Sequence, residues 1–298
     1  MSEPKIVVIG PGAIGGALAG ALLDAGRRPV IAARTPFDRL EVTVGEAVVA
    51  ADVEVVCEPS RLAAADVVVL ATKTTQTEGA AEALAATCVP GTLVVIAQNG
   101  VRHRENVRPF VDDRAELVPV VLNLPVRRDA PGRITVGGRT ELTFERSAAA
   151  DRIADLFAGS FLRVTLTDDW PTALWTKLLI NAAFGAVGVL TGRDSSVMTD
   201  PGGYEVTRAL MSEILPVARA EGATLADDLP DRILSNAIKT VSGHRSSITT
   251  DRLNGERTEW WDRNKIVGVL GRAHGIATPL NDLVTELIRL GEPECEPQ

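Results

Sequence analysis

The chain has 298 residues, of which 45% are hydrophobic, which is typical of a globular protein with two domains. Its formal net charge of −8 disfavours non-specific attraction to nucleic acids or anionic membranes. No uninterrupted apolar run approaches the roughly 20 residues that span a bilayer, and the first residues do not resemble a signal peptide. We therefore predict a cytoplasmic protein with no nucleic-acid and no membrane partner.

The cysteines and histidines are few and scattered, and none has the spacing of metal ligands. Cys57, Cys88 and Cys295 cannot all pair in disulfides, which fits a reducing compartment. The sequence therefore predicts no metal site.

The first predicted element is a strand, Lys5 to Ile9, that runs directly into Gly10-Pro11-Gly12-Ala13-Ile14-Gly15. In a G-x-G-x-x-G loop the first glycine makes a tight turn, the second lets a pyrophosphate approach the backbone, and the third allows close packing of helix on strand. The following helix, Ala13 to Asp24, would present free N–H groups and its positive dipole end to the phosphates. This order predicts a dinucleotide-binding loop.

The second predicted strand, Pro29 to Ala33, ends at Arg34, about 20 residues after the last glycine. An NAD enzyme would carry Asp or Glu here to hold the ribose 2′-hydroxyl, whereas a guanidinium offers several donors to a phosphate on that hydroxyl. We therefore expect NADPH rather than NADH. The alternative is that Arg34 is simply a solvated strand end.

Further strands alternate with helical stretches such as Gly79 to Ala86, which predicts an α/β fold with a doubly wound parallel sheet. The apolar, β-branched runs are Val53 to Cys57, Asp66 to Ala71, Leu93 to Ala97 and Leu117 to Leu122. Shorter strands are expected at Arg133 to Val136, Glu141 to Glu145 and Leu162 to Leu166, the first two joined as a hairpin by Gly137-Gly138. These should complete an NADP-binding Rossmann domain over residues 1–167.

Helical patterns replace strand patterns in the remaining chain, so residues 168–298 are expected to form an all-helical substrate and catalytic domain. The predicted helices are Trp170 to Leu190, Gly203 to Glu221, Asp231 to Val241 and Thr258 to His274. The acidic, Pro-containing tail from Gly291 to Gln298 is expected to be frayed.

Lys177 and Asn181 are four residues apart and share one face of a mostly apolar predicted helix. Reduction of a ketone needs a proton for the carbonyl oxygen, and a Lys ammonium with a lowered pKa can donate it while stabilising the developing alkoxide. Asn181 could orient the same substrate oxygen or a neighbouring hydroxyl. The alternative is a surface lysine beside an unremarkable asparagine.

A second polar region runs from His244 to Asp251 and continues to Glu259. The hydroxyls of Ser246 and Ser247 lie beside basic residues and could bind a carboxylate, while Glu259 suits an ammonium or ribose hydroxyls. By itself the region is also compatible with a helix N-cap followed by a polar surface.

Together these residues resemble the ketopantoate reductases, also called 2-dehydropantoate 2-reductases. The resemblance covers essentially the whole chain, and it rests on the order and spacing of several modest motifs. They are Gly10–Gly15, Arg34, Thr72-Lys73, Gln98-Asn99-Gly100, Leu174-Trp175-x-Lys177-x-x-x-Asn181, Ser246-Ser247 with Glu259, and Ala273-His274-Gly275-Ile276-Ala277-Thr278-Pro279-Leu280-Asn281.

The resemblance implies a Rossmann domain plus a helical domain, NADP(H) as cofactor and reduction of a small 2-keto acid to a 2-hydroxy acid. It makes Lys177 the proton donor and Glu259 the carboxylate that contacts the cofactor and supports the lysine. Lys73 and Asn99 would lie near the nicotinamide ribose, with Asn99 also reaching the substrate. Ser247 would hold the substrate carboxylate, and Asn181 its hydroxyls.

Three departures from the family put the exact substrate in question. A second asparagine one turn after Asn181, followed by proline, is replaced by Gly185-Ala186, which removes an amide worth about 1 to 3 kcal/mol if its partner is buried. Trp260-Trp261-Asp262 replaces the usual pattern after Glu259, and Gly255-Glu256 interrupts the helix expected there.

Ketopantoate is the leading substrate, with a related branched keto acid as a further candidate. One rival is a β-hydroxyacid dehydrogenase-like oxidoreductase, which also uses a Lys-x-x-x-Asn pair, but its D-A-P-V-S-G-G segment is replaced here by Leu124 to Asp129. Another is a noncatalytic NADP(H)-binding protein, because a fold does not fix a function. The oligomeric state is left open, with a homodimer as one candidate.

Overall fold

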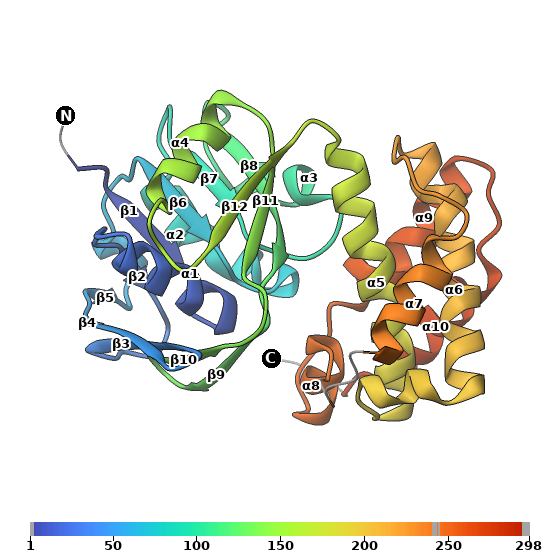
Figure 1. Ribbon diagram of the computed structural model, residues 1–298. Helices are drawn as coiled ribbons and strands as arrows, with labels where there is room; N and C mark the ends of the chain where they lie inside the picture. Colours follow the sequence, from blue (N-terminus) through green and yellow to red (C-terminus); the bar gives the residue numbers. More distant parts are fainter. Residues whose placement is uncertain (1–2, 240–242, 244, 294–298) are drawn as a thin grey trace. The chain divides into compact units, whose positions relative to one another are not determined.

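The computed structural model describes residues 3–239, 243 and 245–293, and the chain divides into two compact units, Met1–Asp168 and Asp169–Gln298 (Figure 1). Several sequence-based expectations lie outside the described residues. These are His244, Cys295, the end of the tail at 294–298 and the end of the helix expected up to Val241.

The first unit is built on an eight-stranded sheet with the strand order β12-β11-β8-β7-β6-β1-β2-β5. All neighbouring strands in it are parallel except β8 and β11, which are antiparallel. The strands are β1 (Ile6–Ile9), β2 (Val30–Ala32), β5 (Val55–Val56), β6 (Val67–Leu70), β7 (Leu93–Ile96), β8 (Glu116–Asn123), β11 (Glu141–Glu145) and β12 (Arg163–Thr167). The helices are α1 (Ala13–Asp24), α2 (Ala81–Thr87), α3 (His103–Val107) and α4 (Ala148–Leu156).

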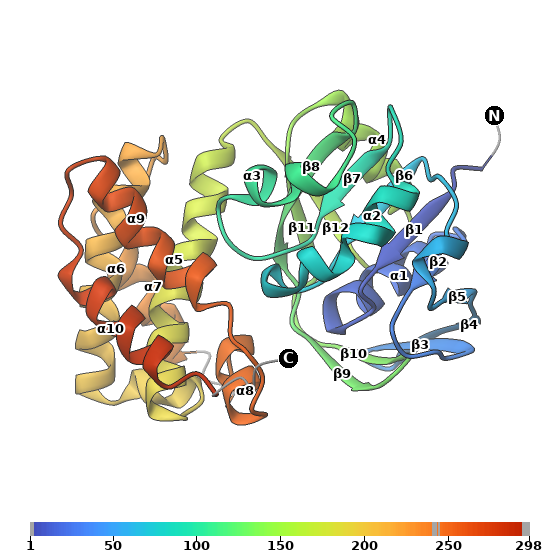
Figure 2. The same ribbon diagram turned by 180° about the vertical axis from the view of Figure 1, so that it is seen from behind.

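Both faces of the central strands are buried, because successive side chains of a strand point to opposite sides. In β1, Ile6 and Val8 enter one core, which also contains the apolar residues of α1 and α4, whereas Val7 and Ile9 enter a second core with those of α2. Helices therefore cover both faces of the sheet (Figures 1 and 2). This confirms the doubly wound α/β fold predicted from the alternating pattern.

A second sheet of four strands, in the order β4-β3-β10-β9, packs on α1 and was not expected from the sequence (Figure 1). Its strands are β3 (Arg39–Val44), β4 (Ala47–Asp52), β9 (Val126–Ala130) and β10 (Arg133–Val136). A Cβ added to Gly16 of α1 would lie 2.6 Å from the Ile134 side chain, and one added to Gly20 would collide with Val42. These two glycines, one helical turn apart, therefore allow the small sheet to lie directly on the helix.

The predicted Gly137-Gly138 hairpin is wrong. The strand before these glycines, β10, pairs with β3 and β9 in the small sheet, whereas the strand after them, β11, pairs with β8 and β12 in the large sheet. The two glycines thus carry the chain from one sheet to the other. A local turn signal cannot distinguish these outcomes, because β10 pairs instead with the preceding strand β9 and the distant β3, and β11 with β8 and β12.

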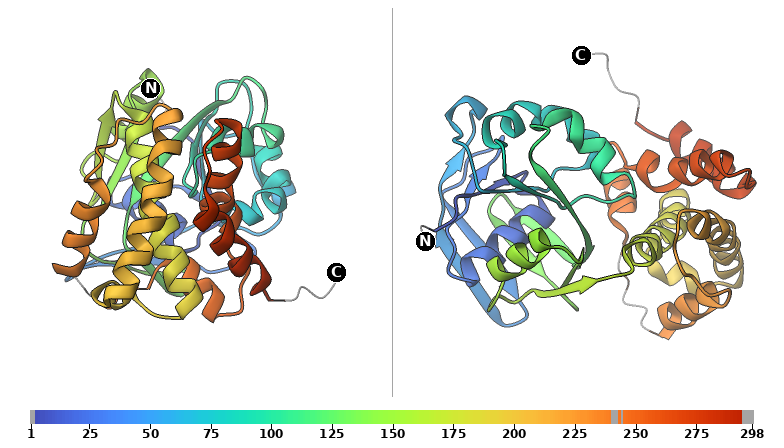
Figure 3. Two further views of the ribbon diagram at one scale, coloured as in Figure 1. Left: turned by 90° about the vertical axis from the view of Figure 1, so that its right-hand side faces the viewer. Right: turned by 90° about the horizontal axis from the view of Figure 1, so that it is seen from above.

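The second unit is helical, as the sequence predicts, and its helices appear in Figure 3 from two further directions. They are α5 (Trp170–Thr191), α6 (Pro201–Ala220), α7 (Leu229–Lys239), α8 (Ser247–Leu253), α9 (Ile266–Ala273) and α10 (Pro279–Leu290). Asp169 caps α5 by accepting a hydrogen bond from the Thr172 N–H, and Gly192 ends it in the left-handed conformation.

By length and composition alone, α5 could cross a membrane, so the apolar stretch is longer than the sequence analysis recognised. This is weak evidence for a membrane span, because the core helix of a globular protein meets the same criterion. Within the most apolar window of α5, 61% of the residues are buried in the structure. The helix accordingly packs against α6, α8 and α10 of its own unit.

Two details of the second unit differ from expectation. The segment predicted as one helix from Thr258 to His274 instead begins with a π-helical turn, Trp261–Lys265, that continues into α9. The start of the tail is anchored rather than frayed, because Glu292 accepts hydrogen bonds from Arg252 at 2.8 Å and from the Thr258 hydroxyl at 2.6 Å.

Candidate functional site

The glycine loop Gly10–Gly15 lies at the carboxyl end of β1, between β2 and β6. The chain leaves β1 toward β2 on one side, while β6 lies on the other, so this is the point where the strand order reverses and open α/β sheets bind ligands. Gly10 has φ of +85° and donates its N–H to the Ala32 carbonyl at 3.1 Å. A Cβ on Gly10 would lie 2.9 Å from the Thr72 nitrogen, so the loops after β1 and β6 are in contact.

The three glycines of the loop have different surroundings. A Cβ on Gly15 would collide with the Gly10 carbonyl oxygen and lie 3.0 Å from the Ala71 Cβ, whereas one on Gly12 would meet nothing within 4 Å. Gly12 is also the N-cap of α1, which has no side-chain cap and no acidic residue in its first turn. The open, positive end of α1 at Gly12 therefore fits the phosphates of a dinucleotide.

The other residues predicted to hold the cofactor follow neighbouring strands. Arg34 is exposed two residues beyond the end of β2. Lys73 is half-buried at the start of the 3-10 turn Thr74–Gln76 after β6, and Asn99 is half-buried after β7. The structure thus places the loop, Arg34, Lys73 and Asn99 at the carboxyl ends of four adjacent strands, β2, β1, β6 and β7.

Gln98 joins the loops that carry Lys73 and Asn99, a role that sequence reasoning missed. Its buried amide nitrogen lies 2.9 Å from the Thr77 hydroxyl, 3.1 Å from the Thr72 carbonyl and 3.2 Å from the Thr72 hydroxyl. His103, also buried, donates from Nε2 to the Gln98 carbonyl at 3.0 Å. Burial lowers the pKa of His103 to about 4, so the ring is neutral near pH 7.

We expect Gln98→Leu to loosen the loops after β6 and β7. The substitution leaves the buried Thr77 hydroxyl and the half-buried Thr72 carbonyl without their partner, which typically costs about 1–3 kcal/mol for a buried group. Thermal unfolding should therefore shift downward, and NADPH binding measured by fluorescence should weaken with it. Gln76→Leu is the control, because Gln76 is exposed in the same region and should leave both quantities unchanged.

Lys177 lies in the middle of α5, with buried Leu174, Trp175 and Leu178 beside it in the sequence. Burial, and secondarily the positive charge of Arg263, lowers the pKa of the Lys177 ammonium to about 8. A lysine with this pKa is mostly protonated near neutral pH and still able to give up its proton. These are the properties required of a proton donor, and they do not fit a solvated surface lysine.

Asn181 follows Lys177 by one turn of α5, and Gly185 follows by two, so the three positions share a face. The missing side chain at Gly185 does not leave a hole, because a Cβ there would lie 3.0 Å from Ile248 Cγ2 of α8 and 3.8 Å from Arg263 Nη1. Farther along the face, a Cβ on Gly188 would lie 2.6 Å from the Thr249 hydroxyl. Glycine at both positions therefore allows α8 to pack closely on α5.

Restoring the family asparagine should consequently fail. We expect Gly185→Asn to push Ile248 aside and to destabilise the protein by about 1–3 kcal/mol, as overpacked cores do. Chemical denaturation measures this loss, and steady-state kinetics should show no gain in kcat/KM for ketopantoate. Improved kcat/KM with unchanged stability would contradict the packing explanation.

Ser246, Ser247 and Glu259 occupy distinct positions around α8. Ser246 is the N-cap, with its hydroxyl 3.4 Å from the Thr249 nitrogen, so the capping alternative applies to this serine. Ser247 is exposed, and its hydroxyl lies 2.8 Å from Arg263 Nη2. The same Nη2 is 3.2 Å from an oxygen of the buried Glu259 carboxylate. Ser247 and Glu259 are therefore joined by Arg263.

Sequence reasoning also missed Arg263, whose side chain is only 2% exposed. The available signal was that Arg263 follows Glu259 by four residues, the spacing at which opposite charges pair on one helical face. The pair also comes just before the apolar run of α9. Such pairs are usually solvated, so the signal does not predict burial. Among the described residues, no group of His, Cys, Asp and Glu is arranged to hold a metal ion.

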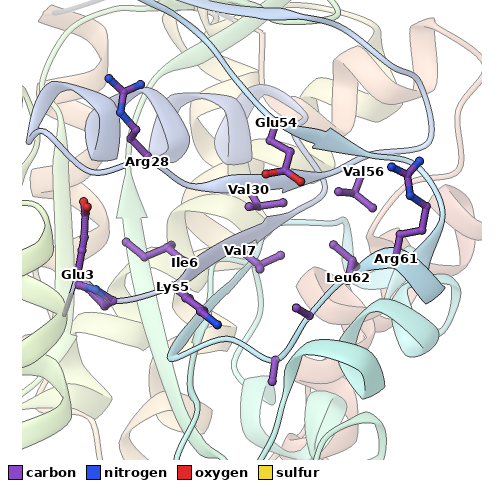
Figure 4. A pocket seen from close by; sticks show the side chains of 13 residues that line it. Glu3, Lys5, Ile6, Val7, Arg28, Val30, Glu54, Val56, Arg61 and Leu62 are labelled. Atoms are coloured by element: carbon purple, nitrogen blue, oxygen red, sulfur yellow. The ribbon is translucent and has the colours of Figure 1, made fainter.

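A pocket of about 380 Å³ lies elsewhere in the first unit, at the amino ends of β1, β2 and β5 (Figure 4). Its walls include Lys5, Val30 and Arg61. The glycine loop begins at the opposite, carboxyl end of β1. Since ligands of open α/β sheets bind at the carboxyl ends of the strands, we assign the dinucleotide to the glycine loop and not to this pocket.

Comparison with known families covers both units. A family model described as "Ketopantoate reductase PanE/ApbA" matches residues 6–149. A second model, "Ketopantoate reductase PanE/ApbA C terminal", matches residues 169–292. These matches confirm the resemblance drawn from the sequence motifs.

Individual relatives agree with the family models. A 2-dehydropantoate 2-reductase of Caulobacter vibrioides is 38% identical over 287 residues, covering 95% of this chain and 98% of the relative. One from Mycobacterium tuberculosis is 33% identical over 285 residues, covering 95% and 96%. The crystal structure of a PanE/ApbA family ketopantoate reductase from Ralstonia eutropha matches with a TM-score of 0.87 and 29% identity, covering 97% of this chain and 98% of that one.

Proposed function

The chain belongs to the ketopantoate reductase family, and on this basis we propose that it reduces 2-dehydropantoate (ketopantoate) to pantoate with NADPH. The structural observation that carries the proposal is Lys177, whose pKa is lowered to about 8 in an apolar helix. In a chain of this family, such a lysine supplies the proton that reduction of a ketone requires. The reaction belongs to pantothenate biosynthesis.

The residues of the first unit fit NADP(H). The backbone N–H groups at the start of α1 and the open space at Gly12 suit the pyrophosphate, and the exposed Arg34 suits the 2′-phosphate of the adenosine ribose. Lys73 and Asn99, held through Gln98, would bind the nicotinamide ribose, with Asn99 also reaching the substrate. When bound, NADPH supplies the hydride.

The second unit supplies the acid and the substrate contacts. Lys177 donates a proton to the carbonyl oxygen and, while charged, stabilises the negative charge that develops on it. Ser247 donates its hydroxyl to the substrate carboxylate, and Asn181 binds the substrate hydroxyl. Glu259 supports the charge of the lysine and contacts the cofactor. Its carboxylate also pairs with Arg263 at 3.2 Å.

Product analysis tests the proposal. Purified protein incubated with ketopantoate and NADPH should form pantoate and NADP⁺ in equal amounts, identified by mass spectrometry. Formation of pantoate without matching NADP⁺, or no pantoate at all, would contradict it. Reduction of a related branched 2-keto acid in preference to ketopantoate would keep the reaction type and change the substrate.

Two further proposals concern the quaternary state, for which the sequence analysis offered a homodimer as one candidate, and the location, which it predicted to be the cytoplasm. We propose a homodimer in the cytoplasm, to be checked by sedimentation velocity and by fractionation of cells expressing the protein. A single species of 31.5 kDa in sedimentation would contradict the dimer.

A further inference from the structure

Arg263 is a buried cation at the centre of the residues proposed to handle the substrate. Its side chain is 2% exposed, and its Nη2 contacts both Ser247 and Glu259. Its Nε is buried and has no hydrogen-bond partner among the described residues. A guanidinium is costly to bury when its donors are not all satisfied, so its retention here calls for an explanation.

The contact with Ser247 determines what the serine can do. A serine hydroxyl has one O–H donor and two acceptor lone pairs. Arg263 can only donate, so the 2.8 Å contact makes Ser247 the acceptor and leaves its own O–H free to donate to another group. Ser247 is an exposed residue, so this O–H can reach a ligand, and the buried ion pair of Arg263 and Glu259 lies behind it.

Arg263 also lies beside position 185, where family members carry an asparagine and this chain has glycine. Its Nη1 lies 3.8 Å from where a Cβ on residue 185 would be, so the guanidinium is beside the place from which the second asparagine would project. The π-helical turn Trp261–Lys265 holds Arg263 there, and Asn264 of the same turn donates to the Ala182 carbonyl of α5 at 3.0 Å. Irregular turns of this kind are frequent at functional sites.

We propose that Arg263 is a positioning residue that makes this site selective for the carboxylate form of its 2-keto acid substrate, because its guanidinium, held by Glu259, occupies an acceptor lone pair of the Ser247 hydroxyl and leaves that hydroxyl to act as a donor. This inference rests on the proposed function. It adds to that function a residue whose guanidinium lies beside the place from which the family asparagine would project.

The test compares a substrate with and without its carboxylate charge. Initial rates of NADPH oxidation are measured with ketopantoate and with its primary amide, for the wild type, Arg263→Gln and Arg263→Lys. We expect the wild type to prefer the acid, and Arg263→Gln to reduce the acid-to-amide ratio of kcat/KM by about tenfold or more, mainly through KM. Arg263→Lys, which keeps the charge, should retain most of the ratio.

Controls separate this role from a structural one. Arg252→Gln removes another largely buried arginine, paired with Glu292, and should leave the ratio unchanged. In a Ser247→Ala background, Arg263→Gln should have no further effect on the ratio, since Arg263 acts through Ser247. If Arg263→Gln does not fold, Ser247→Ala alone must still lower the ratio, and an unchanged ratio would overturn the inference. Equal losses for acid and amide, or additive effects in the cycle, would overturn the inference.

A pH profile and a binding measurement complete the test. In Arg263→Gln the alkaline limb of kcat/KM should move to higher pH, because the charge that lowers the pKa of Lys177 is gone. If the alkaline limb of the kcat/KM profile does not move, the charge of Arg263 does not lower the pKa of Lys177. If the wild type shows no turnover, the proposed function fails. The inference about Arg263 can then still be tested by calorimetry, which gives the ratio of the affinities for pantoate and for its amide without catalysis.

Discussion

Replacing Lys177 by alanine is expected to reduce kcat for ketopantoate reduction by about 10²- to 10⁴-fold, the usual contribution of a positioned general acid. NADPH binding should persist, because Lys177 is not a proposed cofactor residue, and all of these except Glu259 lie in the other unit of the chain. Stopped-flow or steady-state kinetics measures the first quantity and fluorescence titration the second. Turnover near the wild-type value would remove Lys177 from the mechanism.

Lys239→Ala is the matched control, since Lys239 is an exposed lysine in the last turn of α7. It should leave kcat unchanged. The wild-type pH profile gives a second check. The donor must be protonated, so kcat/KM should be constant below the Lys177 pKa of about 8 and fall as the pH rises through it.

Arg34→Ala is expected to weaken NADPH binding by about 10- to 100-fold, the loss of one or two charge-assisted hydrogen bonds to phosphate. NADH has no 2′-phosphate, so its affinity should change little. The ratio of the affinities for NADPH and NADH should therefore fall by the same factor of about 10 to 100. Calorimetric or fluorescence titrations with both cofactors measure this directly.

The control for Arg34 is Arg39→Ala, which removes an exposed arginine of the same segment that is paired with Asp52 at 3.1 Å. It should weaken neither cofactor. An equal loss of NADPH and NADH affinity in Arg34→Ala would instead make Arg34 a general support of the loop and would leave NADPH preference to other residues.

The glycine loop could be predicted from the sequence because its constraints are local. The positive φ of Gly10 and the close contact of Gly15 with the Gly10 carbonyl oxygen involve residues within a short stretch of chain, although the loop also meets Ala71 and Thr72. The small sheet was missed for the opposite reason. Gly16 and Gly20 must be glycine because Ile134 and Val42 pack directly on them. These two residues come together only when β3 and β10, which are far apart in sequence, pair in the small sheet.

The second unit shows the same limit at its candidate site. The spacing of Lys177 and Asn181 on one helix was sufficient to suggest a shared face, and burial then explains the lowered pKa of Lys177. What occupies the space at Gly185 depends on how α8 and the π-helical turn pack on α5, which no local pattern encodes. For the same reason, Arg263 was not singled out before its contacts with Ser247 and Glu259 were known.

The most direct test of the central claim is the rate of NADPH oxidation by the purified protein with ketopantoate, beside a panel of other 2-keto acids and 3-keto acids. The proposed function predicts saturable turnover with the highest kcat/KM for ketopantoate and little reaction with 3-keto acids. Tight NADPH binding without turnover of any 2-keto acid would contradict it and would favour a noncatalytic NADP(H)-binding protein.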